Sequence, residues 1–275
     1  MAAPRLITPL HGQYSWLIEP VGQIVKVGAR GEIQARFCSG FNIAENGYFL
    51  TAGHCMSDEG VCYDNGFPPS LRDTRISFEY QCMPNNDLRV CNVVTKERTH
   101  VIKRIVGQGY CNYNGSSQLD YSVLWLEPSA SKYGYLSLST KKPEVNDQVV
   151  CVQHPNGQPK QYSNGIVQAV YPQSNLIDHT AHTYPGSSGS PVVSLAGKKA
   201  VAVHVSGSVN SNKVPDQLHH YAVPTKRILT AAIAKQESWP EKVGIFSQRN
   251  NRRDSDIRID DAGHNPRRPK PGGCC

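Results

Sequence analysis

The chain has 275 residues, of which 39% are hydrophobic and 19% are charged, and its formal net charge is +7. These proportions are those of a globular protein and exclude a chain that is disordered throughout. No apolar run is long enough for a transmembrane helix, and the lysines and arginines form no aromatic-interleaved stripe, so we expect no nucleic-acid role.

The N-terminal segment, residues 1–21, is expected to be an extension in front of the folded domain. Its first twelve residues lack the continuous apolar stretch of a secretory signal, which predicts a cytosolic protein.

Short runs rich in β-branched and aromatic residues follow, separated by clusters of Gly, Pro, Asn and Asp. Gln23–Val27, Arg75–Tyr80 and Gln148–Val152 are examples. Their spacing indicates an all-β antiparallel barrel or sandwich. The one clear helical pattern spans 225–235, with Thr225 as its expected cap and an apolar face of Ile228, Leu229, Ala232 and Ile233.

Three strings carry side chains that can act together. The string TAGHC, residues 51–55, contains His54, and LDYSVL, residues 119–124, contains Asp120. The string TYPGSSGSP, residues 183–191, places Ser188 in a glycine-flanked turn. A serine hydroxyl is a weak nucleophile at neutral pH and needs a base within hydrogen-bond reach. His54 can take the proton, and Asp120 can orient the imidazole and stabilise its charged form. The amides of Gly186 and Ser188 can bind the oxyanion that forms during attack.

Each string alone is typical of something simpler, such as a loop, a core histidine or a turn aspartate. Together, in the order His, Asp, Ser and with an apolar run beside each, they resemble the chymotrypsin-like (trypsin-like) serine peptidases. The resemblance spans about 22–235 and implies a chymotrypsin-like double antiparallel β-barrel with a C-terminal helix. It places barrel one at about 22–127, the join near 128–132, barrel two at about 133–224 and the helix at 225–235, within a protease domain at 22–238.

The motif GSSGSPV is closest to that of glutamyl endopeptidases and intracellular trypsin-like peptidases. Digestive and clotting relatives have an aspartate where this chain has Ser187, and that aspartate pairs with a freed N-terminus. Activation by that route is not expected here, so other hydrogen bonds must hold the oxyanion loop. The segment QHPNG, residues 153–157, is similar to a His-Pro-x-Gly segment of the same proteins, in which His154 takes a structural role.

The apolar-His-apolar segment at 201–207 resembles the S1 region of glutamyl endopeptidases and picornavirus main proteases. The resemblance implies that His204, Thr183 and Ser206 bind a Glu or Gln at P1, the residue before the cut. An imidazole N–H and a hydroxyl can both donate to the oxygen of that side chain. His182 stands where trypsin-type enzymes carry an acid, which disfavours cleavage after Lys or Arg. The alternative is that His204 is a satisfied histidine in a buried strand.

The nine cysteines leave at least one thiol free or paired between chains. The resemblance places Cys38 and Cys55 where many secreted relatives have a disulfide. Four more cysteines lie between His54 and Asp120, namely Cys62, Cys82, Cys91 and Cys111. In a reducing cytosol all would be thiols, which is the state predicted here, and a secreted protein is the alternative that the cysteines leave open. No Cys-x-x-Cys pair is present, so we expect no metal and no cofactor.

Residues 239–275 are expected to form a disordered basic tail, rich in Pro and Gly, that ends in Cys274 and Cys275. The pair resembles the lipidated ends of small vesicle-trafficking GTPases, which implies peripheral membrane association. S-palmitoylation and an unmodified tail are the alternatives.

We therefore predict a serine endopeptidase that acts on protein or peptide substrates through an acyl-enzyme. A second class is a catalytically silent protease-fold protein that binds peptides. A third is an esterase, which has little support because the strand-turn-helix of a Gly-x-Ser-x-Gly elbow is absent. The oligomeric state is left open.

Overall fold

The structure is a computed structural model of the chain. It describes residues 5–6, 15–56, 71–85, 88–109, 119–209 and 218–245. Cys62, Cys111 and the terminal pair Cys274 and Cys275 lie outside the described residues, as does the tail from residue 246 onward. The predictions made for them therefore stay predictions.

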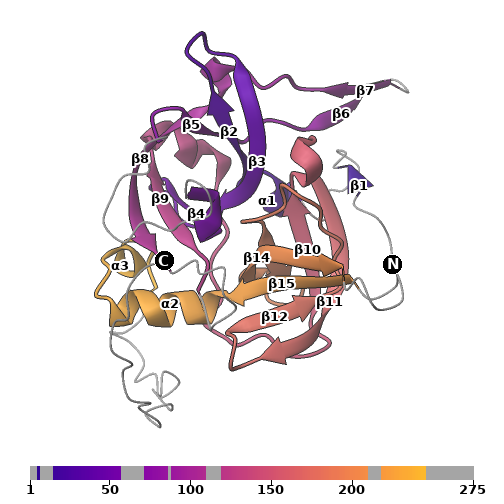
Figure 1. Cartoon of the computed structure of the whole chain (residues 1–275), viewed down its shortest axis with the longest axis vertical. Helices are drawn as coiled ribbons and strands as arrows, with labels where there is room; N and C mark the ends of the chain where they lie inside the picture. Colours follow the sequence, from indigo (N-terminus) through magenta and orange to yellow (C-terminus); the bar gives the residue numbers. More distant parts are fainter. Residues whose placement is uncertain are drawn as a thin grey trace, which may run out of the picture.

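Six antiparallel strands close the first barrel in the order β2-β3-β4-β9-β8-β5 (Figure 1). The strands are β2 (Val21–Val27), β3 (Ile33–Asn42), β4 (Tyr48–Thr51), β5 (Thr74–Ser77), β8 (His100–Gln108) and β9 (Ser122–Leu126). Inward-facing side chains fill the interior, and Phe49 packs edge-on against Phe78 with ring centroids 5.8 Å apart. Strand β2 is buried along its length except at Lys26, so both of its faces are covered.

The second barrel runs in the order β11-β10-β13-β14-β15-β12 and closes through the pairing of β11 with β12. Its strands are β10 (Gln148–Gln153), β11 (Gln161–Tyr171), β12 (Leu176–His179), β13 (Pro191–Ser194), β14 (Lys199–Val209) and β15 (Leu218–Pro224). A short strand, β1 (Arg5–Leu6), adds to β11. The predicted all-β double barrel is confirmed.

Shorter elements connect and flank the barrels. They are α1 (Ser15–Ile18), η2 (Gly53–Met56), η3 (Lys96–Arg98), η4 (Pro128–Tyr133), η5 (Pro155–Gly157), α2 (Thr225–Ala234), α3 (Trp239–Lys242) and the hairpin β6 (Cys82–Asn85) with β7 (Leu88–Cys91). The predicted join at 128–132 coincides with η4. Among the residues described, no helix is long and apolar enough to cross a membrane.

Helix α2 follows the predicted pattern but begins differently. Pro224 is the N-cap, and Thr225 is already helical. The Thr225 hydroxyl is fully buried and donates to the Ser139 carbonyl at 2.7 Å, so it joins the helix to the barrel rather than capping it. Ile228, Leu229 and Ala232 are buried as expected, whereas Ile233 is 40% exposed.

The C-terminal boundary of the domain is later than the sequence indicated. Trp239 is fully buried in the main core, and its indole N–H donates to the Glu237 carboxylate at 2.6 Å. Tyr121 also donates to that carboxylate, at 3.3 Å. Residues 239–245 therefore belong to the folded domain, because a buried tryptophan anchors the segment after α2.

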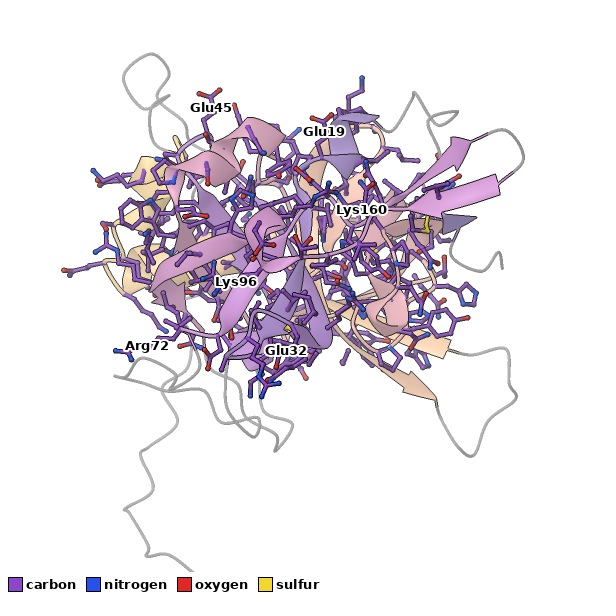
Figure 2. The ribbon with its side chains drawn as sticks, turned by 90° about the horizontal axis from the view of Figure 1, so that it is seen from above. Glu19, Glu32, Glu45, Arg72, Lys96 and Lys160 are labelled. Carbon is purple, nitrogen blue, oxygen red and sulfur yellow. A yellow bond between two sulfur atoms is a disulfide. The ribbon has the colours of Figure 1, made fainter. Side chains whose placement is uncertain are left out.

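The N-terminal boundary is earlier than expected, since residues before 22 pack into the core. Leu17 and Val21 are fully buried. Lys160, also fully buried, donates to the Ile18 carbonyl at 2.6 Å and to the Phe78 carbonyl at 2.9 Å. Figure 2 shows Lys160 within the body of the molecule. The amine thus joins α1, the first barrel and the start of β11.

Replacing Trp239 with alanine tests the C-terminal anchor. We expect Trp239→Ala to lower the free energy of unfolding by about 3–5 kcal/mol, because it removes a large buried side chain. Trp125→Ala, at a half-buried site, is the matched control and should cost clearly less. Denaturant unfolding measures both, and a loss at Trp239 below about 1 kcal/mol would contradict the anchor.

Lys160 predicts an unusual pH dependence of stability. Burial lowers its pKa from 10.5 to about 7, so above pH 7 the unfolded chain binds more protons than the folded chain. Stability should therefore rise with pH, by about 2 kcal/mol between pH 7 and 9. Lys160→Met should remove this rise, and Lys226→Met, at an exposed lysine, should retain it. Urea unfolding at the two pH values measures the free energy of unfolding. An equal rise in this free energy in the two variants would show that Lys160 does not cause it.

Candidate active site

The pairing of β4 with β9 brings together His54 and Asp120. Thr51, the last residue of β4, lies opposite Ser122 at the start of β9. The short η2 turn after β4 presents His54, and Asp120 stands just before β9. Two residues 66 positions apart thus meet because their strands are neighbours.

His54 and Asp120 are joined by two hydrogen bonds. The distance from His54 Nδ1 to Asp120 Oδ2 is 2.6 Å, and the His54 backbone amide donates to Asp120 Oδ1 at 2.9 Å. Both carboxylate oxygens are therefore held, and the proton on the ring belongs on Nδ1, which leaves Nε2 as the basic nitrogen. The side chains are 30% and 20% exposed, so solvent or a substrate can reach them.

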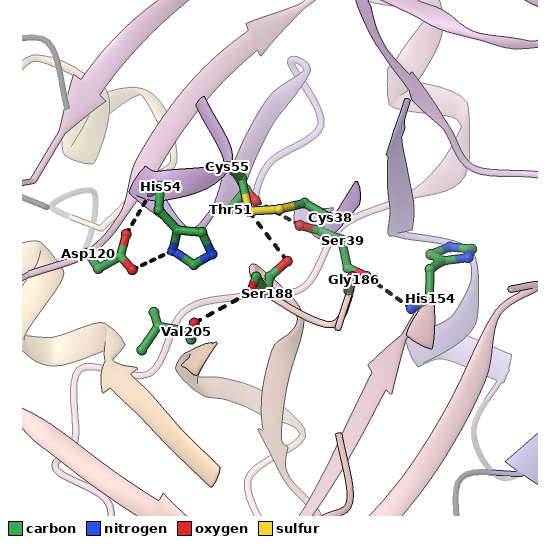
Figure 3. The surroundings of a disulfide bond; sticks show 10 residues. All are labelled: Cys38, Ser39, Thr51, His54, Cys55, Asp120, His154, Gly186, Ser188 and Val205. Carbon is green, nitrogen blue, oxygen red and sulfur yellow. Dashed lines mark hydrogen bonds and ion pairs between the residues drawn. A yellow bond between two sulfur atoms is a disulfide. The ribbon is translucent and has the colours of Figure 1, made fainter. Parts of the chain in front are cut away.

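Ser188 lies on the loop that leads into β13. Its hydroxyl donates to the Val205 carbonyl at 3.4 Å, and its own carbonyl accepts from the Ser39 amide at 2.8 Å. In Figure 3 the ring of His54 is drawn between Asp120 and Ser188. The structure thus places the three predicted residues at one site, with the first two on one barrel and the serine on the other.

Between Gly186 and Ser190, two backbone amides have no acceptor within the part of the chain that the structure describes. The amides of Ser187, Gly189 and Ser190 donate to backbone carbonyls. Those of Gly186 and Ser188 donate to no acceptor among the described residues. These are the two amides that the sequence assigned to an oxyanion hole, and free donors are what such a hole requires.

Gly186 has a backbone that other residues adopt with strain. Its φ is +90°, and a Cβ there would lie 2.9 Å from the His154 carbonyl oxygen and 3.2 Å from the Gly157 nitrogen. Both conditions favour glycine. His154 itself is fully buried, and burial lowers its pKa to about 3. The residue is therefore neutral, and its carbonyl oxygen lies beside Gly186.

A glutamine that sequence reasoning missed holds the residue before the serine. The Ser187 hydroxyl donates to Gln153 Oε1 at 2.5 Å. Gln153 in turn donates to the His182 carbonyl at 2.7 Å. Nothing in the string QHPNG distinguished this side chain from an ordinary strand-end glutamine, because its partners are distant in sequence.

The cysteines differ from the expected reduced state. A disulfide joins Cys38 to Cys55, with Cα atoms 6.1 Å apart, at the position that the resemblance implied (Figure 3). A second joins Cys82 to Cys91, which lie directly opposite each other in the β6–β7 hairpin. Strand pairing brings these partners close enough to bond. Cys151 is a buried free thiol, and burial raises its pKa to about 12.

One group of side chains near the site has the composition of a metal site. Donor atoms of Cys38, His54 and Cys55 lie within 4.8 Å of one another. Both sulfurs are in the disulfide, so neither is a thiolate that could bind a metal. The expectation that no metal or cofactor is needed stays a prediction.

The predicted S1 residues lie in a cluster of histidines. His204 is 2% exposed, and its Nδ1 is 3.3 Å from Nε2 of the buried His179. Thr183 does not contact His204 by a hydrogen bond, and its Oγ1 lies 2.7 Å from Nδ1 of His220 instead. The rings of His204 and His220 are 6.3 Å apart.

The next residues of β14 lie beside Thr183 and His220, since Gly207 pairs with His220. Ser206 is exposed on β14, and a Cβ on Gly207 would lie 3.5 Å from His220 Nδ1 and 3.9 Å from Thr183 Oγ1. His182 lies 5.7 Å from His220, ring to ring. Sequence reasoning missed His220 because the only signal, a His-His pair in a strand, carries no spacing rule.

Burial makes the clustered histidines poor bases. It lowers the pKa of His179 to about 3 and that of His220 to about 4, and it lowers that of His204 well below the ordinary value. The charge of neighbouring histidines acts in the same direction. At neutral pH His179, His204 and His220 are therefore uncharged and offer N–H donors and nitrogen acceptors.

Residues 38–203 match the family model of the trypsin-like peptidase domain. The chain belongs to that family. It is 25% identical over 197 residues to the Secreted RxLR effector protein 73 of Plasmopara viticola, an alignment that covers 66% of this chain and 45% of that relative. The chain thus spans less than half the length of this curated relative.

Two solved structures share the fold. A serine endoprotease from Yersinia pestis superposes with a TM-score of 0.53 at 16% identity, over 79% of this chain and 62% of that one. Neuropsin, a serine protease expressed in the limbic system of mouse brain, superposes with a TM-score of 0.56 at 14% identity. That superposition covers 86% of this chain and 100% of the neuropsin chain. At these identities the likeness concerns the fold alone.

Proposed function

We propose that this trypsin-like peptidase-fold protein is an active serine endopeptidase whose triad is Ser188, His54 and Asp120. The observation that carries the proposal is the His54–Asp120 hydrogen bond beside a serine loop with two free amides. A silent relative needs neither a held tautomer nor unpaired donors, so the geometry favours turnover over passive peptide binding.

The chemistry follows from these atoms. Ser188 Oγ attacks the scissile carbonyl carbon while His54 Nε2 accepts the hydroxyl proton. The amides of Gly186 and Ser188 bind the oxyanion of the tetrahedral intermediate. His54 then donates its proton to the leaving amine, which departs and leaves an acyl-enzyme. Water, deprotonated by His54, hydrolyses that ester and returns Ser188 to its starting state.

Specificity for Gln or Glu at P1 is a second part of the proposal. Thr183, His204 and His220 offer hydroxyl and imidazole groups where the resemblance places the S1 pocket. Because the histidines are neutral, they suit the amide of Gln directly, whereas a Glu carboxylate must bring a proton onto one of them. Ser206 and the Val205 carbonyl lie on the strand that would pair with the substrate backbone.

The remaining predictions concern the setting of the protein. We propose protein or peptide substrates. Cytosolic localisation, with a secreted protein as its alternative, and membrane attachment through Cys274 and Cys275 stay predictions. The two disulfides favour an oxidising compartment over the cytosol, since cytosolic thiols stay reduced. Analysis of the natural protein by mass spectrometry, for disulfides and for lipid on the tail, decides both points.

A peptide-library digest tests the enzyme and its pocket together. Wild type should cleave after Gln or Glu, and Ser188→Ala should lose at least about a thousandfold in rate. His204→Ala and His220→Ala should lower kcat/KM for these substrates at least about tenfold, since each leaves a polar substrate group without its partner. Labelling of each variant by a fluorophosphonate is the control for an intact triad.

A wild type that folds but neither cleaves peptides nor reacts with the fluorophosphonate is the silent peptide-binding protein. Cleavage after other residues keeps the enzyme and discards the pocket assignment.

The neutral pocket also predicts a pH-dependent choice between the two substrates. Binding of a Glu carboxylate raises the pKa of the nearby histidines and takes up a proton, whereas binding of Gln takes up none. The ratio of kcat/KM for Glu to that for Gln should therefore fall as pH rises from 6 to 8, by up to about tenfold per unit. Effects of pH on the steps that the two substrates share cancel in this ratio. A ratio that is constant across the range would show that no pocket histidine changes its protonation on binding.

A further inference from the structure

The residue before the nucleophile is held without any charge. Ser187 is fully buried, and its hydroxyl donates to Oε1 of Gln153, which is also fully buried. The same hydroxyl accepts from the Tyr184 amide at 3.2 Å. The Ser187 hydroxyl therefore stabilises the turn that begins at Tyr184. Outside this loop, the side chain that binds it is Gln153.

The orientation of that glutamine is determined by its other partners. Its Nε2 donates to the His182 carbonyl at 2.7 Å and to Ser163 Oγ at 3.0 Å. Ser163 Oγ itself donates to the His182 carbonyl at 2.8 Å, so towards Gln153 it can only accept. The amide nitrogen thus has two acceptors, and Oε1 must face Ser187. A flipped amide would oppose oxygen to oxygen.

The residues next to Gln153 hold the same loop. The His154 amide donates to Ser39 Oγ, which donates to the Gly186 carbonyl, with both distances 2.9 Å. The Asn156 amide donates to the Pro185 carbonyl at 2.5 Å. The segment from Gln153 to Asn156 therefore reaches three successive residues of the loop, at Pro185, Gly186 and Ser187.

We propose that Gln153 is a positioning residue for the oxyanion hole, acting through Ser187 to keep the amides of Gly186 and Ser188 free and aimed at the substrate. The proposal rests on the proposed peptidase function and assigns how its site is kept competent. A neutral network of Gln153, Ser163 and Ser187 orders the loop as the chain folds, and within the described ranges Ser187 has no charged partner. Competence of the site is then a property of the folded chain and does not depend on cleavage in front of it.

Gln153→Met tests this assignment, because methionine fills a similar volume and makes no comparable hydrogen bond. Gln148→Met, at the exposed start of the same strand, is the matched control. With a P1 Gln peptide, we expect Gln153→Met to lower kcat at least about tenfold with KM within about threefold, since the oxyanion amides act mainly in the transition state. Hydrogen exchange of the peptide that covers 183–189 should rise in this variant and not in the control.

A second variant protects the test against misfolding. Ser187→Ala removes the same hydrogen bond with a smaller change, and it should reproduce the loss of kcat. The loss in the double variant should be clearly smaller than the product of the two single losses, because both changes break the hydrogen bond between Ser187 and Gln153. Unchanged kcat in the folded single variants overturns the proposal, as does a rise in KM with kcat unchanged.

The two proposals fail in different ways. If wild type neither cleaves peptides nor reacts with a fluorophosphonate, the peptidase function is wrong. Hydrogen exchange still decides the role of Gln153 in that case, because loop protection is measured without turnover. Equal exchange at 183–189 in Gln153→Met and Gln148→Met shows that Gln153 does not position the loop.

Discussion

The site depends on one contact between the two barrels, made by Ser39. Its amide donates to the Ser188 carbonyl at 2.8 Å, and its hydroxyl donates to Gly186 while accepting from His154. Its carbonyl accepts from the Thr51 hydroxyl at 2.7 Å. One small residue of the first barrel thus uses its amide and its hydroxyl to fix the serine loop of the second. His54 and Asp120 are carried by the first barrel, so their distance from Ser188 is set here.

Close approach of the backbones is the condition for this contact. Gly189 follows the serine with φ +88°, and a Cβ there would lie 2.1 Å from the Ser39 carbonyl oxygen. The glycine-serine string could be recognised in the sequence because the turn and the close approach to Ser39 require glycine at fixed positions next to the serine. The same holds for the strings around His54 and Asp120, where a strand and a tight turn set the placement of the side chain. Motifs of this kind could be predicted from the sequence alone.

Side chains whose partners are far away in the sequence could not be predicted in this way. Gln153 and His220 have partners 34 and 37 residues away, and neither stands in a string that is unusual by itself. The domain ends were missed for a related reason, since Leu17 and Trp239 are single apolar residues whose burial depends on the finished barrels. Thr225 was assigned to a cap because local rules describe helix ends, while its hydroxyl found a better acceptor across the fold.

The disulfide in the β6–β7 hairpin has a consequence for how the chain withstands proteolysis. Cys82 and Cys91 face each other at the base of the ribbon and are covalently joined. A single cut anywhere in the chain between them would open the ribbon without releasing either strand, because both stay attached through the sulfur atoms and the body of the protein. A cut in this projecting hairpin would then leave the two parts of the chain covalently joined.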